Sequence, residues 1–219
     1  RRLKGRGLST MQCPVLFEAP VAASLIGHFV GAVSGGSLYR KSSFLLDRLD
    51  TQVFSSVMRI DDVPNIRRGL ASSVFDDEGV KAQRRTIVED GVLHGYFLGS
   101  YSARKLGMQT TGNAGGNHNL IVQPGNSDFN ALLKKMGKGL LVTELLGHGV
   151  NPVTGDYSRG AAGFWVEHGE IQYPVEEITI AGNLKEMFKG IVEVGNDVLV
   201  QGSRQCGSVL IERMSVAGR

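Results

Sequence analysis

The sequence predicts an α+β domain that is rich in β-strands, mainly antiparallel, arranged as a barrel or as layers, with about three helices. Strand-like segments are repeatedly joined by short turns of the kind that close β-hairpins. The chain shows neither an alternation of strands with helices nor a GxGxxG loop, which are typical of a parallel, doubly wound sheet. A mainly antiparallel sheet is therefore favoured.

Residues 19–33 are the first expected helix. Pro20 stands where the first helical turn tolerates proline, and Gly35-Gly36 is a helix-stop signal. Apolar side chains lie nearly all round the segment, so we expect a central, buried helix. Its histidine, His28, is most simply a core residue with satisfied hydrogen bonds.

Two hairpins are expected further along the chain. Strand-like runs flank Asp90-Gly91, a dipeptide that suits a type I′ turn, and the segment GFWVEHGEIQYPV turns at His168-Gly169. His168 is expected to be exposed in its turn. The segment LLVTEL is expected to be a buried strand, and SVLIERMSVAG the terminal strand.

Two more helices complete the expected elements. An amphipathic helix is expected in SDFNALLKKMGKG, begun by Ser127 or Asp128 and stopped by one of the glycines at its end. Its apolar face would hold Phe129, Leu132, Leu133 and Met136. The segment LKEMFKGIVEVG follows Asn183, which has Glu186 three residues later, as in a capping box.

Composition indicates an ordinary intracellular protein. With 219 residues, 42% of them hydrophobic, the chain can bury a core without disulfides. Cys13 and Cys206 are expected to be small buried residues, and so few cysteines fit a cytoplasmic location. The scattered net charge of +3 argues against a nucleic-acid partner, and no apolar run is long enough to cross a membrane. Residues 1–12 are expected to be a linker or a cut end, followed by one domain over residues 13–219.

Familiar catalytic motifs are missing from the sequence. It contains no HExxH, no GxSxG and no phosphate-binding loop, and none of its five histidines has another within ten residues. His118 and His148 lie in glycine-rich loops and could line a cleft. The acidic run FDDEG, residues 75–79, lacks the spacing of a Ca²⁺-binding loop and is more simply a solvated turn.

Residues 140–184 are unusually rich in glycine. Seven glycines occur from Gly147 to Gly182 inclusive, together with a Thr-Gly-Asp turn, two histidines and an Arg-Gly pair. Glycine is used where φ is positive or where another group must approach the backbone closely. The segment is therefore either turn-rich β-structure or the wall of a site.

Several long motifs resemble the TldD/PmbA family. They are FDDEG, GVLHGYFLGSYSARKLG, TTGNAGG, GLLVTELLGHGVNPVTGDYSRGAAGFWVEHGEIQYPVEEITIAGNL and QCGSVLIERMSVAG. The last two are most similar to the PmbA (TldE) branch. The resemblance starts near residue 13 and continues to the end of the chain. It implies the C-terminal half of a longer protein, without the N-terminal α/β domain of the family.

The resemblance implies a cytosolic metallopeptidase built from TldD-type and PmbA-type subunits. Such an enzyme degrades unfolded proteins, processes a peptide antibiotic precursor and degrades an antitoxin, with zinc held by an HExxxH helix of the TldD-type partner. Here that helix falls on residues 22–31, where Leu25, Ile26 and Val30 take the chemical positions and His28 is out of register. Aliphatic side chains neither bind zinc nor act as a base. We expect no catalytic residue, metal or cofactor in this chain, and Cys206 is expected not to be a ligand.

The same resemblance implies that residues 147–163 shape a peptide-accepting cavity or a partner interface, unless their glycines serve turn geometry alone. The expected contributors are His148, Gly149, Asp156, Tyr157, Arg159 and, from another loop, His118. Asp156 would fix the turn through an Asx-type hydrogen bond, Tyr157 would pack across the interface and Arg159 would bind a carboxylate.

Three kinds of partner are expected: a TldD-like subunit, unfolded or short peptides, and a second copy of the chain through self-association. The alternative function is a non-enzymatic interaction module, in line with an older family label of DNA gyrase modulator. Peptidase activity of this chain alone is disfavoured, because the metal-binding side chains are missing.

Overall fold

The computed structural model describes residues 5–218 of the chain. Residues 1–4, which belong to the expected linker or cut end, and residue 219 lie outside the described residues. Within the rest of that segment, Leu8 is buried and Arg6 forms a β-bridge with Val175. The first strand begins at Met11.

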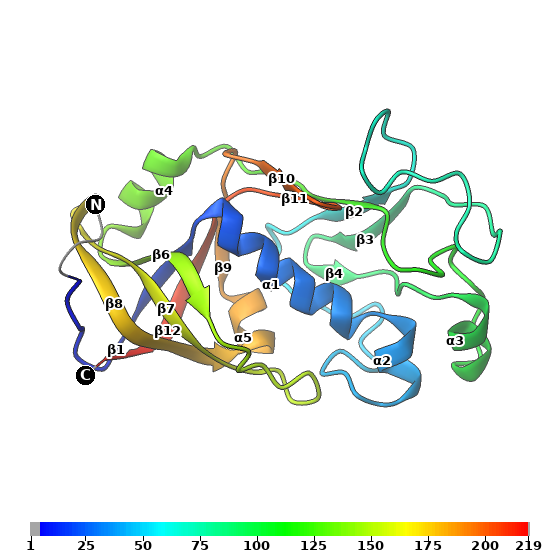
Figure 1. Ribbon diagram of the computed structural model, residues 1–219, viewed down its shortest axis with the longest axis horizontal. Helices are drawn as coiled ribbons and strands as arrows, with labels where there is room; N and C mark the ends of the chain where they lie inside the picture. Colours follow the sequence, from blue (N-terminus) through cyan, green and yellow to red (C-terminus); the bar gives the residue numbers. More distant parts are fainter. Residues whose placement is uncertain (1–4, 219) are drawn as a thin grey trace.

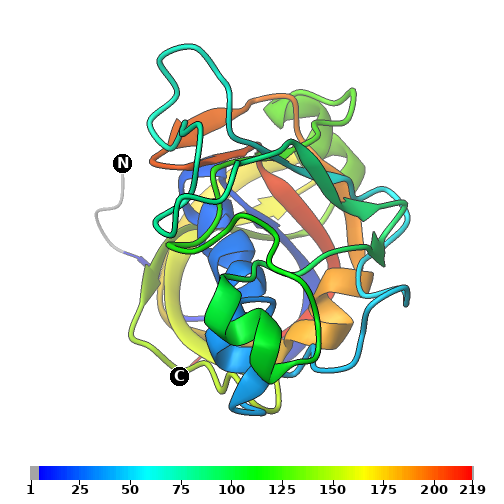
Figure 2. The same ribbon diagram turned by 90° about the vertical axis from the view of Figure 1, so that its right-hand side faces the viewer.

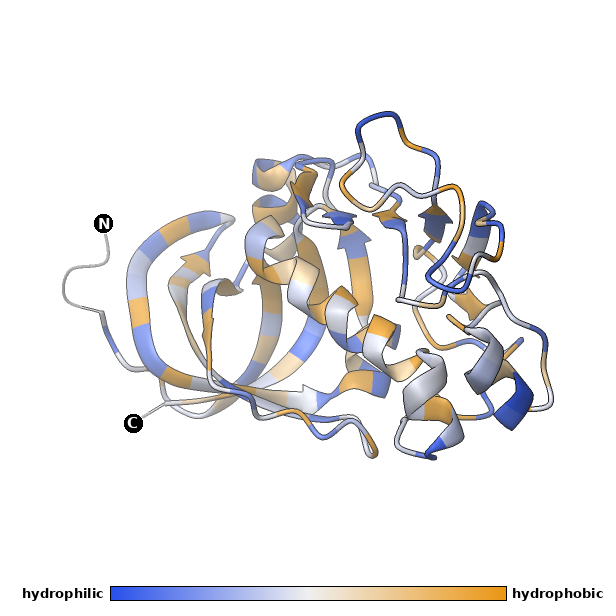
Figure 3. Cartoon of the chain, turned by 45° about the vertical axis from the view of Figure 1, so that its right-hand side comes forward, coloured by the Kyte–Doolittle hydropathy of each residue, from blue (hydrophilic) through white to orange (hydrophobic). Residues whose placement is uncertain are grey.

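In the described residues, five strands close a mixed β-barrel in the order β1-β6-β7-β8-β12, because β12 also pairs with β1. A further strand, β9, continues the sheet beyond β12 (Figure 1). Hydrophobic and polar residues alternate along the barrel strands in Figure 3, as expected for strands with one buried face. The bounds are β1 Met11–Phe17, β6 Gly139–Leu146, β7 Asp156–Glu167, β8 Glu170–Asn183, β9 Ile191–Val194 and β12 Val209–Ala217.

A second sheet lies beside the barrel, with the strand order β10-β11-β5-β2-β3-β4. Its strands are β2 Ile60–Val63, β3 Arg85–Glu89, β4 Val92–Leu93, β5 Asn119–Val122, β10 Leu199–Gln201 and β11 Arg204–Cys206.

The prediction of mainly antiparallel pairing holds for most neighbours, but β1–β6 and β11–β5 are parallel. These strands are joined by long stretches of chain, so no hairpin turn forces them to run in opposite directions.

Five helices occur in the described residues, where about three were expected. Helices α1 and α4 match the expected segments. Helix α5 covers only the first half of the expected helix LKEMFKGIVEVG, because Ile191–Val194 pairs with β12 as strand β9. Helices α2 and α3 were missed because one or two turns are too short to show a helical period. Gly35-Gly36 was also read wrongly, since α1 ends before it and α2 begins with it. The bounds are α1 Ala19–Ala32, α2 Gly35–Tyr39, α3 Ser100–Lys105, α4 Phe129–Met136 and α5 Leu184–Lys189.

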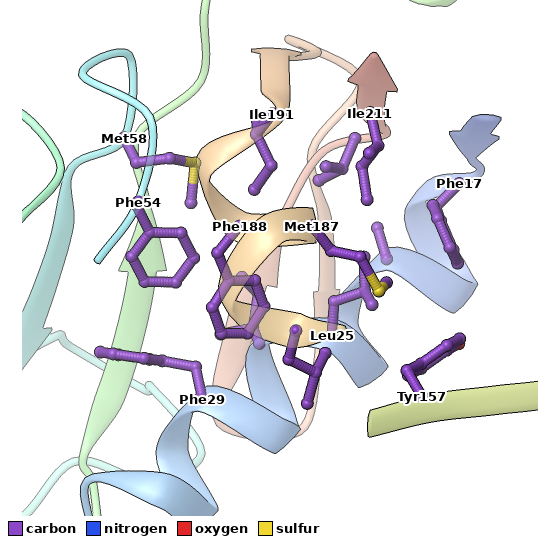
Figure 4. Packing of buried hydrophobic residues seen from close by; sticks show 14 of the residues in the cluster. Phe17, Leu25, Phe29, Phe54, Met58, Tyr157, Met187, Phe188, Ile191 and Ile211 are labelled. Carbon is purple, nitrogen blue, oxygen red and sulfur yellow. The ribbon is translucent and has the colours of Figure 1, made fainter. Parts of the chain in front are cut away.

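Helix α1 joins the barrel to the second sheet, as the two perpendicular views show (Figures 1 and 2). It contacts β6 of the barrel and β10 and β11 of the second sheet. The prediction of a central helix is confirmed, because Leu25, Ile26 and Phe29 are at most 1% exposed. Around them the core collects aromatic and sulfur-containing side chains, with Phe54 stacked on Phe188 at 4.4 Å between ring centroids (Figure 4).

Both predicted hairpin turns are confirmed. Asp90 and Gly91 have φ values of 48° and 79° between β3 and β4, and His168 and Gly169 have 55° and 73° between β7 and β8. Two successive left-handed residues are the mark of a type I′ turn. His168 is exposed, as expected.

The polar residues that begin two helices were also predicted correctly. The Asp128 carboxylate accepts a hydrogen bond of 2.7 Å from the Ala131 amide at the start of α4. The Asn183 side chain accepts one of 3.0 Å from the Lys185 amide at the start of α5. No helix in residues 5–218 combines the length and the apolar character needed to cross a bilayer.

Candidate functional site

The three chemical positions of the expected metal helix lie on α1 and carry only aliphatic side chains. Leu25 and Ile26 are each 1% exposed and point into the core, and Val30 packs against it. None of them offers a lone pair to a cation. Over residues 5–218, no three His, Cys, Asp or Glu side chains come together as a ligand set. The residues of this chain therefore do not fit a resident zinc ion at this helix.

The more open face of α1 is flanked by four polar side chains from three elements. They are His28 of α1, Tyr157 and Arg159 of β7, and Arg204 of β11. The His28 and Tyr157 rings meet edge to face, with 6.0 Å between their centroids. The positive charges of Arg159 on β7 and Arg204 on β11 both lower the pKa of the His28 imidazole. We call these four residues the α1 cation cluster.

The strand and helix geometry explains how the α1 cation cluster is assembled. Alternate residues of a strand point to one face, so Tyr157, Arg159 and Ala161 share the inward face of β7. On the other side, Arg204 lies against α1 at Gly27. A Cβ atom at that glycine would be only 3.0 Å from Nη1 of Arg204. The missing side chain thus lets a guanidinium lie directly on the helix.

Polar atoms in the α1 cation cluster are buried without partners. Within the described residues, His28 Nε2, Tyr157 Oη, Arg159 Nε and Arg204 Nε have no hydrogen bond. The prediction that His28 is a satisfied core histidine is therefore wrong: it is half-buried, and its buried nitrogen is unpaired. Most buried polar groups in proteins find a partner, so four such atoms beside one helix call for an explanation.

The electrostatics of the α1 cation cluster follow from burial and from the two arginines. Burial lowers the pKa of His28, and the charges of Arg159 and Arg204 lower it further. Burial raises the pKa of Tyr157 to about 12. The Arg159 guanidinium opposes that rise from beside the hydroxyl, in a geometry that leaves Tyr157 Oη and Arg159 Nε without a proper hydrogen bond. At neutral pH the imidazole is neutral, the phenol is protonated and both guanidiniums are charged.

The loop between β6 and β7 is held by its own polar residues. Asn151 accepts from the amides of Val153 and Thr154, which makes the Asx-type turn that was expected of Asp156. The carboxylate of Asp156 instead accepts from the Thr154 hydroxyl at 2.6 Å and from Asn183 Nδ2 at 3.0 Å. The expected turn is present, but Asp156 ties it to the start of α5.

Two other expected site residues belong to the same loop. A Cβ at Gly149 would lie 1.8 Å from the carbonyl oxygen of Ser158, so this glycine is required by a close backbone approach. His148 is exposed. Tyr157 is 1% exposed and its ring meets His28 of α1, and its packing across an interface stays a prediction. Of the five residues expected in this segment, the structure brings only Tyr157 and Arg159 to the α1 cation cluster.

His118 lies in a different part of the molecule. Its Nδ1 is 3.0 Å from Oδ2 of the fully buried Asp62, and its amide donates to the other carboxylate oxygen at 2.7 Å. Asn113 Nδ2 donates to the same Asp62 at 2.9 Å, and Arg85 Nη1 donates to Asn113 at 2.9 Å. This network fastens the glycine-rich loop 112–119 to the second sheet. His118 is therefore not brought together with residues 147–163.

The acidic run 75–79 is only partly the solvated turn that was expected. Asp76 is 6% exposed, whereas Asp77 and Glu78 are exposed. Burial alone would raise the pKa of Asp76, but hydrogen bonds from the amides of Ala114, Val80 and Glu78 hold it below the usual range. Asp76 thus anchors the loop that carries Ala114.

A pocket of about 360 Å³ lies at the C-terminal end of α1. Val30 and Ser34 line one side, and Phe97, Gly99 and the loop 113–116 line the other. Gly27 and Val30 are three residues apart in α1, so Arg204 and the part of the pocket lined by Val30 lie along the same side of the helix. The α1 cation cluster and this pocket together form the candidate site.

Sequence reasoning missed Arg204 and the pocket. Arg204 stands in a strand of three residues with no recognisable motif, and its neighbour Gly27 comes from the other end of the chain. The only local signal was a glycine inside an otherwise apolar helix, which often marks a close approach by another group.

Comparisons with known proteins agree on one family. The model of the PmbA/TldA metallopeptidase C-terminal domain matches residues 10–218. The chain is 57% identical over 218 residues to Metalloprotease PmbA of Escherichia coli O157:H7, covering 100% of this chain and 48% of that protein.

Solved structures show the same similarity. A candidate modulator of DNA gyrase from Bacteroides thetaiotaomicron superposes with a TM-score of 0.95 at 29% identity, over 100% of this chain and 49% of the other. TldE from Thermococcus kodakarensis superposes with a TM-score of 0.86 at 25% identity, over 96% of this chain and 51% of the other. The chain therefore spans about half the length of the relatives it matches.

Proposed function

Since the chain belongs to the TldD/PmbA metallopeptidase family through its C-terminal domain, we propose that it acts within a PmbA/TldE-type subunit that supports a catalytic TldD-like partner. The proposed enzyme works in the cytoplasm. It degrades unfolded proteins and processes short peptides, including an antibiotic precursor and an antitoxin. The partner would hold the zinc ion, which would activate water for peptide hydrolysis.

One observation carries this proposal. The helix that would hold the metal presents Leu25, Ile26 and Val30 at the chemical positions, yet its open face is flanked by Arg159 and Arg204 with unpaired buried atoms. A helix that has no metal chemistry but keeps costly polar groups is better suited to binding than to bond cleavage. The role proposed for this subunit is therefore to close the partner's cleft and to hold the substrate.

The test uses an assembled complex of this protein with a TldD-like partner. Replacing Arg159 with alanine removes one charge-assisted contact, worth about 1.5–3 kcal/mol, so peptidase activity on an unfolded protein should fall about tenfold or more. The control is Arg104→Ala, an exposed arginine on α3. Assembly of each complex is checked by size-exclusion chromatography. Full activity of an intact Arg159→Ala complex would exclude the role given to this side chain.

The second candidate is a non-enzymatic interaction module. It is favoured by the solved relative that is described as a candidate modulator of DNA gyrase. The exposed apolar side chains of Leu70, Val74 and Phe75, close together in one loop, would serve a partner interface under either candidate. The two candidates differ in one measurement, because only the first requires both chains for digestion of an unfolded protein.

A further inference from the structure

The α1 cation cluster has a surplus of hydrogen-bond donors. Each guanidinium carries five N–H donors, and within the described residues the buried Nε atoms of Arg159 and Arg204 have no hydrogen-bond partner and neither side chain forms an ion pair. Tyr157, 1% exposed, adds a hydroxyl that has no partner. Both arginines are half-buried, and leaving their buried Nε donors and the Tyr157 hydroxyl unpaired costs free energy until another group accepts these bonds.

The charges of the α1 cation cluster define what can accept those bonds. Two positive groups from β7 and β11 flank one imidazole, and the ion pairs of the described residues place no carboxylate against either arginine. The missing partner is therefore an anion. A carboxylate has about four lone-pair sites on two coplanar oxygens, which match the planar fork of a guanidinium.

The position of the α1 cation cluster favours a carboxylate that belongs to a peptide. Arg204 rests on the helix backbone at Gly27, and no atom lies within 4 Å of the place where a Cβ of Gly31 would be, one turn further on. The helix surface is thus open beside the cluster and can admit an extended chain. The pocket formed by Val30, Ser34 and Phe97 lies beyond it.

We propose that His28, Tyr157, Arg159 and Arg204 form a binding site for the carboxylate of a peptide, with the C-terminal carboxylate as its ligand. The two guanidiniums bind the carboxylate oxygens, Tyr157 donates its hydroxyl proton to one of them, and His28 Nε2 donates the remaining bond. This inference rests on the proposed function, since it takes the ligand to be a peptide. It names the part of the peptide that this subunit recognises.

The experiment measures binding to this protein directly, without the catalytic partner. The probe is N-acetyl-tetra-alanine with a free C-terminal carboxylate, and its matched control is the same peptide as a C-terminal amide. Binding is followed by NMR through the ring signals of His28, which are assigned by comparison with a His28→Gln variant. We expect a saturable shift of the His28 signals with the acid, and affinity for the amide at least about tenfold weaker.

Variants connect that signal to the named residues. Arg159→Gln and Arg204→Gln should each weaken binding of the acid about tenfold or more, whereas Arg104→Gln on α3 should leave it unchanged. Gly27→Ala is a second test that keeps every charge. Its Cβ displaces the Arg204 guanidinium, so affinity should fall, while folding is retained because alanine favours a helix more than glycine does.

Each other outcome has a defined meaning. Equal binding of acid and amide, or no effect of either glutamine variant, would overturn the site. Inorganic phosphate binding as tightly as the peptide acid would overturn its assignment to carboxylates. If the acid binds as described but Arg159→Ala leaves the activity of the complex intact, the proposed function fails while the site stands. Loss of activity without any binding to this protein would refute the site alone.

Discussion

Gly27 and His28 show how neighbouring residues in one helix can serve opposite purposes. Gly27 offers no side chain, and this lets the Arg204 guanidinium approach the helix. His28 offers an imidazole that meets the ring of Tyr157 edge to face and lies within range of the charge of that guanidinium. Such an environment holds a histidine in its neutral form, because both burial and nearby positive charge disfavour its protonation.

The lowered pKa of His28 has a consequence for stability. The groups that face its ring are Arg159 and Tyr157 from β7 and Arg204 from β11, and Tyr157 is uncharged at neutral pH. As the pH falls, the unfolded chain binds a proton at this histidine near its ordinary pKa of about 6.5. The folded protein binds that proton only at a lower pH. The contribution of His28 to stability is therefore complete above that pH and is lost as the pH falls from it toward the lower, folded value.

We predict that His28→Gln reduces the loss of stability between pH 7 and pH 5. Urea unfolding of the wild-type protein and the variant at both pH values measures the effect, and the difference between the two proteins isolates His28 from the titrating carboxylates. The exposed His168 supplies the control, through a His168→Gln variant. An identical pH dependence in the wild-type protein and His28→Gln would contradict the environment described for this ring.

At the scale of elements, the two sides of α1 have separate roles. Leu25, Ile26 and Phe29 form the side that joins the barrel to the second sheet, while Gly27, His28 and Gly31 form the more open side. The expected metal positions fall on or next to the buried side. Polar side chains placed there would enter the core and would not line an open site.

A pair of substitutions in α1 tests this division. Ile26→Glu places a carboxylate at a residue that is 1% exposed and should lower the free energy of unfolding by about 3 kcal/mol or more. Gly31→Glu places the same side chain where no atom lies within 4 Å of the added Cβ, and should cost little or nothing. Denaturant unfolding compares the two variants. Similar losses would show that the buried side of α1 has been assigned wrongly.

Some of these structural elements could be predicted from the sequence, and others could not. The turns at Asp90-Gly91 and His168-Gly169 were predictable because a type I′ turn depends on its own two residues. Caps such as Asp128 were predictable for the same reason. Parallel pairing of β1 with β6 was not, because four strands of the second sheet, β2 to β5, lie between them in the sequence.

The candidate site also contains residues that the sequence could predict and residues that it could not. Tyr157 and Arg159 could be selected from one glycine-rich segment and the family resemblance. Their neighbours His28 and Arg204 come from opposite ends of the chain, and no local pattern connects them. Only the packing of β7 and β11 on either side of α1 brings the four residues together.

At the scale of the whole molecule, the barrel and the second sheet share one core through α1. The loop between β2 and β3, which extends from the second sheet in Figure 1, carries three exposed apolar side chains. Leu70, Val74 and Phe75 are 80%, 77% and 60% exposed, although they lie close together in the sequence. An exposed apolar group of this kind is typical of a surface that contacts another chain.

We expect this loop to take part in assembly with a TldD-like partner. A stable complex buries about 1,600 Å² or more, and a few large apolar side chains usually supply most of the binding free energy. The double variant Val74→Ser/Phe75→Ser should therefore weaken assembly about tenfold or more, without a loss of thermal stability, because both side chains are already in water. Val200→Ser, at a residue 59% exposed on β10, is the matched control. Analytical ultracentrifugation of the mixed chains measures the dissociation constant. Wild-type affinity in the double variant would place the interface elsewhere on the molecule.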